Sequence, residues 1–554
     1  MHISHLLAFC GLPVALAAYQ NPSIKADIRA DTNRDGKVDL KGTSDKALNG
    51  PALSNEELDD CNDASDNIHR SPRYLAPLKT VPIPSASKNI KGTVSIPDAK
   101  QRRFSRIFRK EGDKWKELKS GLDLGIDGRD TRRPDGWDGR VTVRFELNDG
   151  GVKSSDEVML RVAPVLIHHH LQSVQQVLAV QGNKTDSPYL IGFTESLSSV
   201  VKAAGIKKDL YLFNASDDIW AQGFMEPGYA NMPGPKGTVS IRIMVRSPQD
   251  ERVAGRQLFE YYRKAGVGAV QHLGGARDEI NSGGNIETIP PHTFKGKSWP
   301  SGRVILGNHG KQKHHILPYL LAQEAQHPVL LDTAWLAIGH VDEFVQFLPA
   351  KNKRGWVAVI DDPRAGIKLL EAQRKAGHGD IPAISRKNDT SNGSRDDYSG
   401  WACGPIPVNS PSISGLLNDK KLMKLNDQCA RRIDGNIEIL KREVGLTDED
   451  IIRIPSLFEG SKFPGAEDSR LQVGAFFPGV VNNLVLTGYN TCVAPNPWGP
   501  VVKGKDVIAE AIKAKYSKIG VDLKFIDGWN THHNYGGEVH CGSNSIRDMS
   551  ARWW

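Results

Sequence analysis

The sequence is poor in cysteine, in long hydrophobic runs and in blocks of like charge. It contains six cysteines in 554 residues. Its apolar run at residues 6–18 is shorter than the roughly 20 residues that a membrane-spanning helix needs. The 72 basic and 64 acidic residues are interspersed, without a run of six like charges. These absences argue against a membrane span and against a charged tail that binds nucleic acid. With 39% hydrophobic and 25% charged residues, the composition indicates a globular protein of two or more domains.

The N-terminus carries the pattern of a secretory leader. The apolar run ends in Ala15-Leu16-Ala17, which is a small-x-small cleavage signal. We interpret residues 1–18 as a signal peptide and expect a secreted protein; the alternative is a buried N-terminal strand or helix. Removal of the leader takes Cys10 away and leaves an odd number of cysteines, so at least one thiol stays unpaired. We expect Cys541 to be the one free thiol, with four cysteines available for disulfides: Cys61, Cys403, Cys429 and Cys492.

An acidic stretch follows the leader, at residues 28–39. Its oxygen-bearing side chains have the spacing of a calcium-binding loop, with Gly36 at the sharp turn. Position twelve of that pattern is Gly42 instead of the usual glutamate, so the alternative is a turn that its own side chains stabilise. The predicted calcium ligands are Asp31, Asn33, Asp35 and Asp39.

The rest of the chain divides by pattern near residue 163. Short alternating runs at 78–163 predict a small antiparallel sandwich, whose domain we expect to span residues 19–163. After residue 164, strand-like runs alternate with helical ones, which predicts an α/β domain at 164–554. One unit, a strand followed by a capped amphipathic helix and a glycine, occurs at 238–268 and 356–379 and more loosely at 490–520.

Three strand-like runs lead into polar loops, at residues 209–229, 327–344 and 520–542. If the repeated units surround an axis, these loops meet there. They would bring together one aromatic, one basic, one acidic and one thiol side chain: Trp220, His340, Asp342 and Cys541.

These four side chains suit a planar cation as substrate. A thiolate of Cys541 needs a partner such as His340 to shuttle its proton. The Asp342 carboxylate can accept two parallel hydrogen bonds from a planar cation, and Trp220 offers a flat wall. A guanidinium ligand with its carbon next to sulfur fits this set. Another kind of Cys-His hydrolase, or a satisfied polar core, fits the spacing as well.

Several motifs resemble the protein-arginine deiminases of the pentein superfamily. They are WAQGFMEPGY (220–229), GGNIETIPP (283–291), DTAWLAIGHVDEFVQFLPA (332–350), RKAGHG (374–379) and GGEVHCGSN (536–544). The resemblance implies a five-bladed pentein α/β propeller preceded by a calcium-binding, immunoglobulin-like β-sandwich. It also implies a secreted member of fungal or bacterial type that lacks the N-terminal domain of the vertebrate enzymes. A cytoplasmic location, as in vertebrate members, is the alternative.

The resemblance implies a calcium-dependent conversion of peptidyl-arginine to peptidyl-citrulline and ammonia. Cys541 would attack the guanidinium carbon and form a thiouronium adduct. His340 would protonate the departing ammonia and then activate water, while Asp342 binds guanidinium nitrogens and Trp220 contacts the substrate. The implied partner is a protein or peptide arginine, with no nucleic acid and no membrane. The implied calcium ligands are the side chains of Gln222, Glu226 and Glu287 and the backbone oxygens of Gly283 and Ile286.

The sequence departs from the family at Gly223, where the family has a second guanidinium-binding aspartate. A charge-assisted hydrogen bond is worth about 1.5–3 kcal/mol, so substrate capture should be weakened. We therefore expect Gly223→Asp to raise activity, unless Asp217 or Asp218 already fills the role. The alternative function is a weakened or inactive pentein that binds calcium or arginine-bearing peptides.

Overall fold

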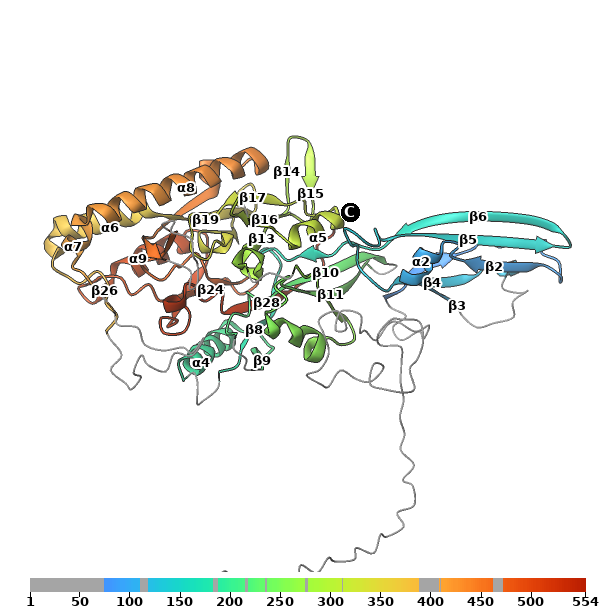
Figure 1. Cartoon of the computed structure of the whole chain (residues 1–554), viewed down its shortest axis with the longest axis horizontal. Helices are drawn as coiled ribbons and strands as arrows, with labels where there is room; N and C mark the ends of the chain where they lie inside the picture. Colours follow the sequence, from blue (N-terminus) through green and yellow to red (C-terminus); the bar gives the residue numbers. More distant parts are fainter. Residues whose placement is uncertain are drawn as a thin grey trace, which may run out of the picture. The chain divides into compact units, whose positions relative to one another are not determined.

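The computed structural model describes most of the chain after residue 73 (Figure 1). The predicted leader, the acidic stretch at 28–39, Asp217, Cys61 and Cys403 lie outside the described residues. Within the described part of the chain, no helix has both the length and the apolar character that a bilayer span requires. The described residues are 74–109, 118–182, 188–214, 218–234, 237–274, 278–310, 312–387, 408, 410–461 and 472–554.

The first described segment forms two antiparallel sheets of three strands, as the alternating pattern predicts. One sheet has the order β1-β4-β3 and the other β2-β5-β6. Buried Ile126 of the first sheet and buried Val141 and Val143 of the second belong to one apolar cluster, so the two sheets share a core. The elements are β1 (Ala76–Lys79), β2 (Lys91–Ser95), α2 (Ala99–Phe104), β3 (Ser105–Arg109), β4 (Asp123–Gly128), β5 (Arg140–Asp149) and β6 (Val152–Arg161).

The remaining described residues form an α/β arrangement in which one sheet design occurs five times. In each sheet a central strand pairs antiparallel with one neighbour and parallel with the other. In the first sheet, β8 (Val174–Val180) lies between β28 (Ser543–Arg547) and β9 (Tyr211–Phe213), and α4 (Pro188–Ala204) makes the parallel crossover. Because β28 is the last strand of the chain, it joins the end of the chain to the first sheet.

The other four sheets repeat this design with different crossovers. The second is β7 (Leu166–Ile167), β10 (Met225–Gly234), β11 (Gly237–Arg246) and β12 (Val267–Val270), with the crossover turns η2 (Val253–Arg256) and η3 (Leu258–Tyr262). The third is β13 (Ile286–Ile289), β16 (Arg303–Asn308) and β17 (Val329–Asp332), with α5 (Ile316–Gln323). The fourth is β18 (Val345–Pro349), β19 (Trp356–Asp362) and β20 (Ile451–Pro455), with α6 (Pro363–Gln373), η7 (Arg374–His378), α7 (Ile413–Asn418) and α8 (Lys420–Val444). The fifth is β23 (Leu484–Leu486), β24 (Thr491–Pro495) and β27 (Asp522–Ile526), with α9 (Val507–Ser517).

Short elements complete the description. Three two-stranded pairs are β14 (His292–Phe294) with β15 (Lys297–Trp299), β21 (Phe458–Ser461) with β22 (Gln472–Ala475), and β25 (Val501–Val502) with β26 (Lys505–Asp506). Single turns are η4 (Glu279–Asn281), η5 (Gly283–Asn285), η6 (Val341–Glu343), η9 (Asp448–Asp450) and η10 (His533–Tyr535).

The predicted strand–helix units are present at 356–379 and 490–520. The Asp362 side chain accepts a hydrogen bond from the backbone N–H of Ala365, with Pro363 in the first helical turn, and Gly377 after the helix has a φ of 86°. Asp506 caps α9 in the same way. The unit at 238–268 is only partly as predicted, because no regular α-helix follows Pro248. Ser247 there bonds to Gln249 and to the carbonyl of Asn281, so the segment is tied to a neighbouring loop and only the turns η2 and η3 form.

The predicted cysteine assignment is wrong for two residues. Cys429 and Cys492 are free and buried, so Cys541 is not the one free thiol. Cys429 lies on the apolar face of α8, four residues before Ile433. Burial raises the pKa of each of these two thiols to about 12. They serve as small core side chains.

Candidate active site

The structure brings His340, Asp342 and Cys541 together, as the loop pattern predicts. His340 lies directly before the turn η6, which follows β17, and Asp342 lies within this turn. Cys541 lies just before β28. Sγ of Cys541 is 3.8 Å from Oδ2 of Asp342, and Nδ1 of His340 is 3.9 Å from Oδ1 of the same carboxylate. Asp342 therefore lies in contact with both the thiol and the imidazole.

His340 is held from two sides. Oε1 of Glu343 accepts hydrogen bonds from the backbone N–H groups of Gly339, at 2.8 Å, and His340, at 2.7 Å. Nε2 of His340 lies 2.8 Å from the carbonyl oxygen of Glu279, so this nitrogen carries a proton and donates. Nδ1 is then left to face Asp342. A side chain at Gly284 would be 2.8 Å from this Nδ1, so only glycine fits against the pair.

Trp220 lies near the thiol but on the far side of Gly537. A Cβ at Gly537 would be 2.5 Å from Cζ3 of Trp220 and 3.1 Å from Cβ of Cys541, so the two side chains flank this glycine. Cys541 also borders a cavity of about 330 Å³. Among the described residues, the indole that lines this cavity belongs to Trp529, which the sequence patterns did not single out.

The thiol of Cys541 is protonated at rest. Burial, and next to it the charge of Asp342, raises the pKa of Cys541 well above its ordinary value. Its backbone is fixed by the side chain of Asn482, whose Oδ1 accepts from the Cys541 N–H at 3.2 Å, and by Gln222, whose N–H donates to the Cys541 carbonyl at 3.1 Å. Formation of the thiolate therefore requires an added positive charge or a base nearby.

His540 is a site residue that sequence reasoning missed. Its Nδ1 donates to Oδ2 of Asp342 at 2.9 Å, and its Nε2 lies 3.2 Å from Oε1 of Glu287. Burial lowers the pKa of His540, but the hydrogen bond to Asp342 and the charges of Glu287 and Asp342 outweigh it, so the pKa is raised. Its position directly before Cys541 was the available signal. His540 links the nucleophile loop to the predicted calcium ligands.

The residues implied as calcium ligands lie close together and fit a hard cation. Nε2 of Gln222 donates to Oε2 of Glu226 at 2.5 Å, while the buried Oε1 of Gln222 has no hydrogen-bond partner among the described residues. Burial and then the charge of Glu287 raise the pKa of Glu226 well above its ordinary value. Burial raises the pKa of Glu287 to about 7. Two buried carboxylates that repel each other, with a free amide oxygen, are a donor set for calcium.

The backbone that carries the other two implied ligands lies against the same segment. The N–H of Gly283 donates to the carbonyl of Gly223 at 2.8 Å, and a Cβ at Gly283 would be 2.2 Å from the carbonyl oxygen of Gln222. Ile286 begins the strand β13, one residue before Glu287. All five implied ligands thus belong to two adjoining segments, 222–226 and 283–287.

The space beside Gly223 is filled by an arginine that the sequence patterns did not indicate. A Cβ at Gly223 would be 2.2 Å from Nη2 of Arg252. This guanidinium pairs with both oxygens of Asp218, at 2.5 and 3.1 Å, and bonds to Gln249 and Ser282 at 3.0 Å each. Asp218 is therefore engaged within the protein and does not replace the missing aspartate, and an aspartate at position 223 would meet Arg252 first.

Comparison with known proteins gives strong matches in sequence. A family model for protein-arginine deiminase (PAD) matches residues 152–554. Protein-arginine deiminase type-4 of Mus musculus is 32% identical over 419 residues, which are 72% of this chain and 56% of the relative. The type-4 protein of Homo sapiens is 32% identical over 433 residues, or 74% of this chain and 58% of the relative. The chain thus spans little more than half the length of these curated relatives.

Solved structures give weaker matches. A C. jejuni agmatine deiminase is 12% identical with a TM-score of 0.37, covering 70% of this chain and 96% of that one. The N-terminal domain of ArgZ, a cyanobacterial arginine dihydrolase, is 10% identical with a TM-score of 0.34, covering 68% of this chain and 99% of that one. TM-scores this low support no argument. The family match covers most of the chain, and the chain belongs to the protein-arginine deiminase family.

Proposed function

We propose that this chain is a calcium-dependent protein-arginine deiminase that converts peptidyl-arginine to peptidyl-citrulline and ammonia. The observation that carries the proposal is the placement of Cys541 and His340 on either oxygen of the Asp342 carboxylate, in a member of this family. The named relatives are protein-arginine deiminases, and we extend that activity to this chain.

Substrate binding would begin at Asp342. Its buried Oδ1 has no hydrogen-bond partner among the described residues and can accept from guanidinium N–H groups. The substrate cation brings the positive charge that the thiolate of Cys541 needs. Trp220, which lies across Gly537 from the thiol, would contact the substrate. These contacts would orient the guanidinium carbon toward sulfur.

The chemistry would then follow in two stages. Cys541 gives its proton to His340, and the sulfur bonds to the guanidinium carbon. The carbon–nitrogen bond breaks, and ammonia leaves with the proton from His340, so a thiouronium adduct remains on Cys541. His340 next takes a proton from water as the water oxygen bonds to the carbon. The sulfur–carbon bond breaks, and His340 returns a proton to the thiol. The new hydroxyl loses its remaining proton to solvent, and citrulline is released.

Calcium would be held by the side chains of Gln222, Glu226 and Glu287 and by the backbone oxygens of Gly283 and Ile286. A bound calcium ion would offset the charge of the two buried carboxylates. Gln222 also donates its backbone N–H to the carbonyl of Cys541, so an ordered segment 222–226 would hold the nucleophile loop in place. We keep the acidic stretch at residues 31–39 as a second proposed calcium site.

We further propose that the five sheets of one design surround an axis as a five-bladed pentein propeller. The pairing of β28 with β8 supports this, because it places the last strand of the chain in the first sheet. The two antiparallel sheets before residue 163 would form the immunoglobulin-like sandwich of the family, and residue 163 would be the domain boundary.

A second candidate function is a weakened or inactive pentein that binds calcium or arginine-bearing peptides. The pairing of Arg252 with Asp218 beside Gly223 favours it, because a guanidinium stands where the family has a substrate-binding carboxylate.

A citrulline assay separates the two candidates. The purified protein is incubated with an arginine peptide in calcium and in chelator, with Cys541→Ser as the control. Calcium-dependent citrulline formation that Cys541→Ser abolishes supports the enzyme. Binding of the peptide without citrulline formation supports the second candidate. If the protein in calcium neither forms citrulline nor binds the peptide, the proposal is overturned.

A further inference from the structure

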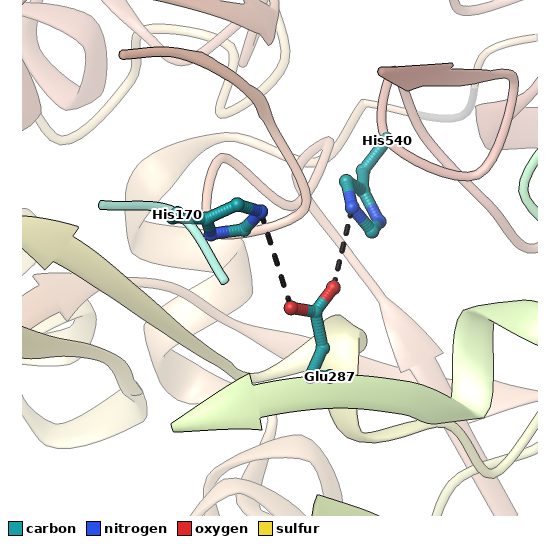
Figure 2. A group of neighbouring side chains, drawn as sticks. All are labelled: His170, Glu287 and His540. Atoms are coloured by element: carbon teal, nitrogen blue, oxygen red, sulfur yellow. Dashed lines mark ion pairs between the residues drawn. The ribbon is translucent and has the colours of Figure 1, made fainter. Parts of the chain in front are cut away.

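Two histidines and a glutamate form a buried cluster beside the predicted calcium ligands (Figure 2). Nε2 of His540 lies 3.2 Å from Oε1 of Glu287, and Nε2 of His170 lies 4.0 Å from Oε2 of the same carboxylate. The three side chains are less than a tenth exposed, and their ligand atoms all lie within 4.8 Å of one another. Figure 2 shows both rings approaching one carboxylate from opposite sides.

Both histidines are oriented through their other ring nitrogen. Nδ1 of His170 lies 3.2 Å from the carbonyl oxygen of Phe347, and Nδ1 of His540 lies 2.9 Å from Oδ2 of Asp342. Since a carbonyl and a carboxylate only accept, Nδ1 carries the proton in each ring. The Nε2 atoms are thereby directed to Glu287. A histidine that donates from one nitrogen to oxygen and ligates through the other is the usual arrangement in metal sites.

We propose that His170, Glu287 and His540 form a binding site for a transition-metal ion of the Zn²⁺ class. Imidazole nitrogens with one carboxylate suit such ions, whereas calcium takes oxygen ligands. Two ligands at about 2.1 Å from a tetrahedral zinc ion are about 3.4 Å apart. The separations of 3.2 and 4.0 Å between the histidine nitrogens and the Glu287 oxygens lie close to this value, so small side-chain movements complete the site.

Zinc and calcium then compete for this protein, because both need Glu287. Zinc bound through Glu287 takes one of the two carboxylates from the calcium set. It also engages His540, which bonds to Asp342 next to Cys541. We therefore infer that zinc opposes calcium activation. This consequence rests on the proposed function, but zinc binding itself does not.

The experiment measures zinc binding in calcium-free protein of the Cys541→Ser form, so that the thiolate does not act as a ligand. Zn²⁺ is titrated and followed by melting temperature, and Co²⁺ is added in its place to read the coordination from visible absorption. We expect one Zn²⁺ ion to bind at the site of His170, Glu287 and His540. Co²⁺ in its place should give the visible absorption of tetrahedral or five-coordinate cobalt. Excess calcium should weaken the apparent zinc affinity.

The deciding variant is His170→Gln, because glutamine keeps an N–H donor for the carbonyl of Phe347. Loss of an outer-shell partner alone lowers metal affinity by 10–100-fold, so loss of a ligand should lower it by about 100-fold or more. The matched control is His292→Gln, since His292 is also buried and its Nδ1 also bonds to a carbonyl, that of Pro290, at 2.8 Å. His292→Gln should bind zinc as the parent does. His170→Phe is a second test variant should the first not fold.

Equal zinc affinity of the parent and a folded His170 variant overturns the proposed zinc site. A zinc affinity that calcium does not change overturns the inferred competition between the two ions. With Cys541 intact, His170→Gln should make the calcium-dependent activity insensitive to zinc. A protein without deiminase activity that still binds zinc through His170 disproves the proposed function and leaves this site standing.

Discussion

The contact between Gly223 and Arg252 predicts a strong coupling between two positions that lie 29 residues apart. A Cβ at position 223 would be 2.2 Å from Nη2, 2.5 Å from Cζ and 2.6 Å from Nη1 of Arg252. These separations are all well below the distance at which a Cβ can approach a non-bonded atom, so Gly223→Ala forces the guanidinium to leave its place. Arg252 has little room to do so, because it is only 3% exposed.

The magnitude follows from what the displaced guanidinium loses. It would leave a bidentate pair with Asp218 and hydrogen bonds to Gln249 and Ser282. Breaking a buried ion pair costs about 3–5 kcal/mol, and overpacking alone costs about 1–3 kcal/mol. We expect Gly223→Ala to lower the free energy of unfolding by about 3 kcal/mol. With Arg252→Ala in the same chain, the added methyl group finds space, and Gly223→Ala should cost less than about 1 kcal/mol.

The assay is a double-mutant cycle by urea denaturation of calcium-free protein. The wild type, Gly223→Ala, Arg252→Ala and the double variant should give a coupling of about 2 kcal/mol. Arg256→Ala serves as the control background, since Arg256 pairs with Glu260 instead. Gly223→Ala should cost as much there as in the wild type. An equal cost of Gly223→Ala with and without Arg252 would refute the reasoning.

The same contact reverses what the sequence predicts for activity. An aspartate at position 223 would pair with Arg252 before it could reach a substrate. We expect kcat/KM of Gly223→Asp to be no higher than that of the wild type. A gain in the single variant would show that Arg252 yields the position to the new carboxylate, and our account of this pair would be wrong.

Three further predictions concern charge and thiols. Burial raises the pKa of Glu287 to about 7, so the stability that this group contributes is fully present below about pH 4.5 and is lost as the pH rises through 7. In calcium-free melts across this window, the free energy of unfolding of the wild type should fall by about 3 kcal/mol, and Glu287→Gln should remove this fall. The same variant should weaken the stabilisation by calcium. Asp342→Asn should lower kcat/KM by about 100-fold or more, since two charge-assisted hydrogen bonds to the guanidinium are lost; a fall below tenfold in the citrulline assay would contradict its role. Iodoacetamide should label Cys541 in native protein, because this thiol is partly exposed and borders the cavity, but should label the buried Cys429 and Cys492 only after denaturation without reductant. Peptide mapping that finds either of these two in a disulfide would contradict the structure.

Local signals were enough to predict much of the fold and the nucleophile's surroundings. The buried run of β19 followed by Asp362 and Pro363 marks a strand and a capped helix without any knowledge of neighbours. The loops after β17 and before β28 were likewise visible as polar segments after apolar runs. Free Cys429 could have been predicted too, because it continues the spacing of Ile433 along α8. The parity of the cysteine count says nothing about which thiols pair.

What the sequence could not indicate are contacts between distant segments. Nothing in the spacing of Gly223 and Arg252 says that one side chain fills the space left by the other. His170 is equally remote from Glu287 and His540, and it lies in a run of three histidines that offers no signal for which of them faces the site. Such contacts depend on how the sheets pack, and the hydrophobic pattern of one segment does not encode this.

The charges of the site indicate why cations should govern it. Glu226, Glu287 and Asp342 are buried, with His540 between the last two, and the half-buried Glu343 follows Asp342 in the chain. Arg252 does not compensate them, because Asp218 already neutralises it. Burial and mutual repulsion raise the pKa of Glu226, so without a cation part of this charge is suppressed by protonation. A cation at Glu287 restores the charged form there, while a guanidinium would bind at Asp342. His540 contacts both Glu287 and Asp342, so a change of charge at one carboxylate alters the electrostatic environment of the other. We therefore expect calcium, zinc and substrate to bind with linked affinities. The affinity for an arginine peptide should depend on calcium in the wild type, and this dependence should be lost in His540→Asn.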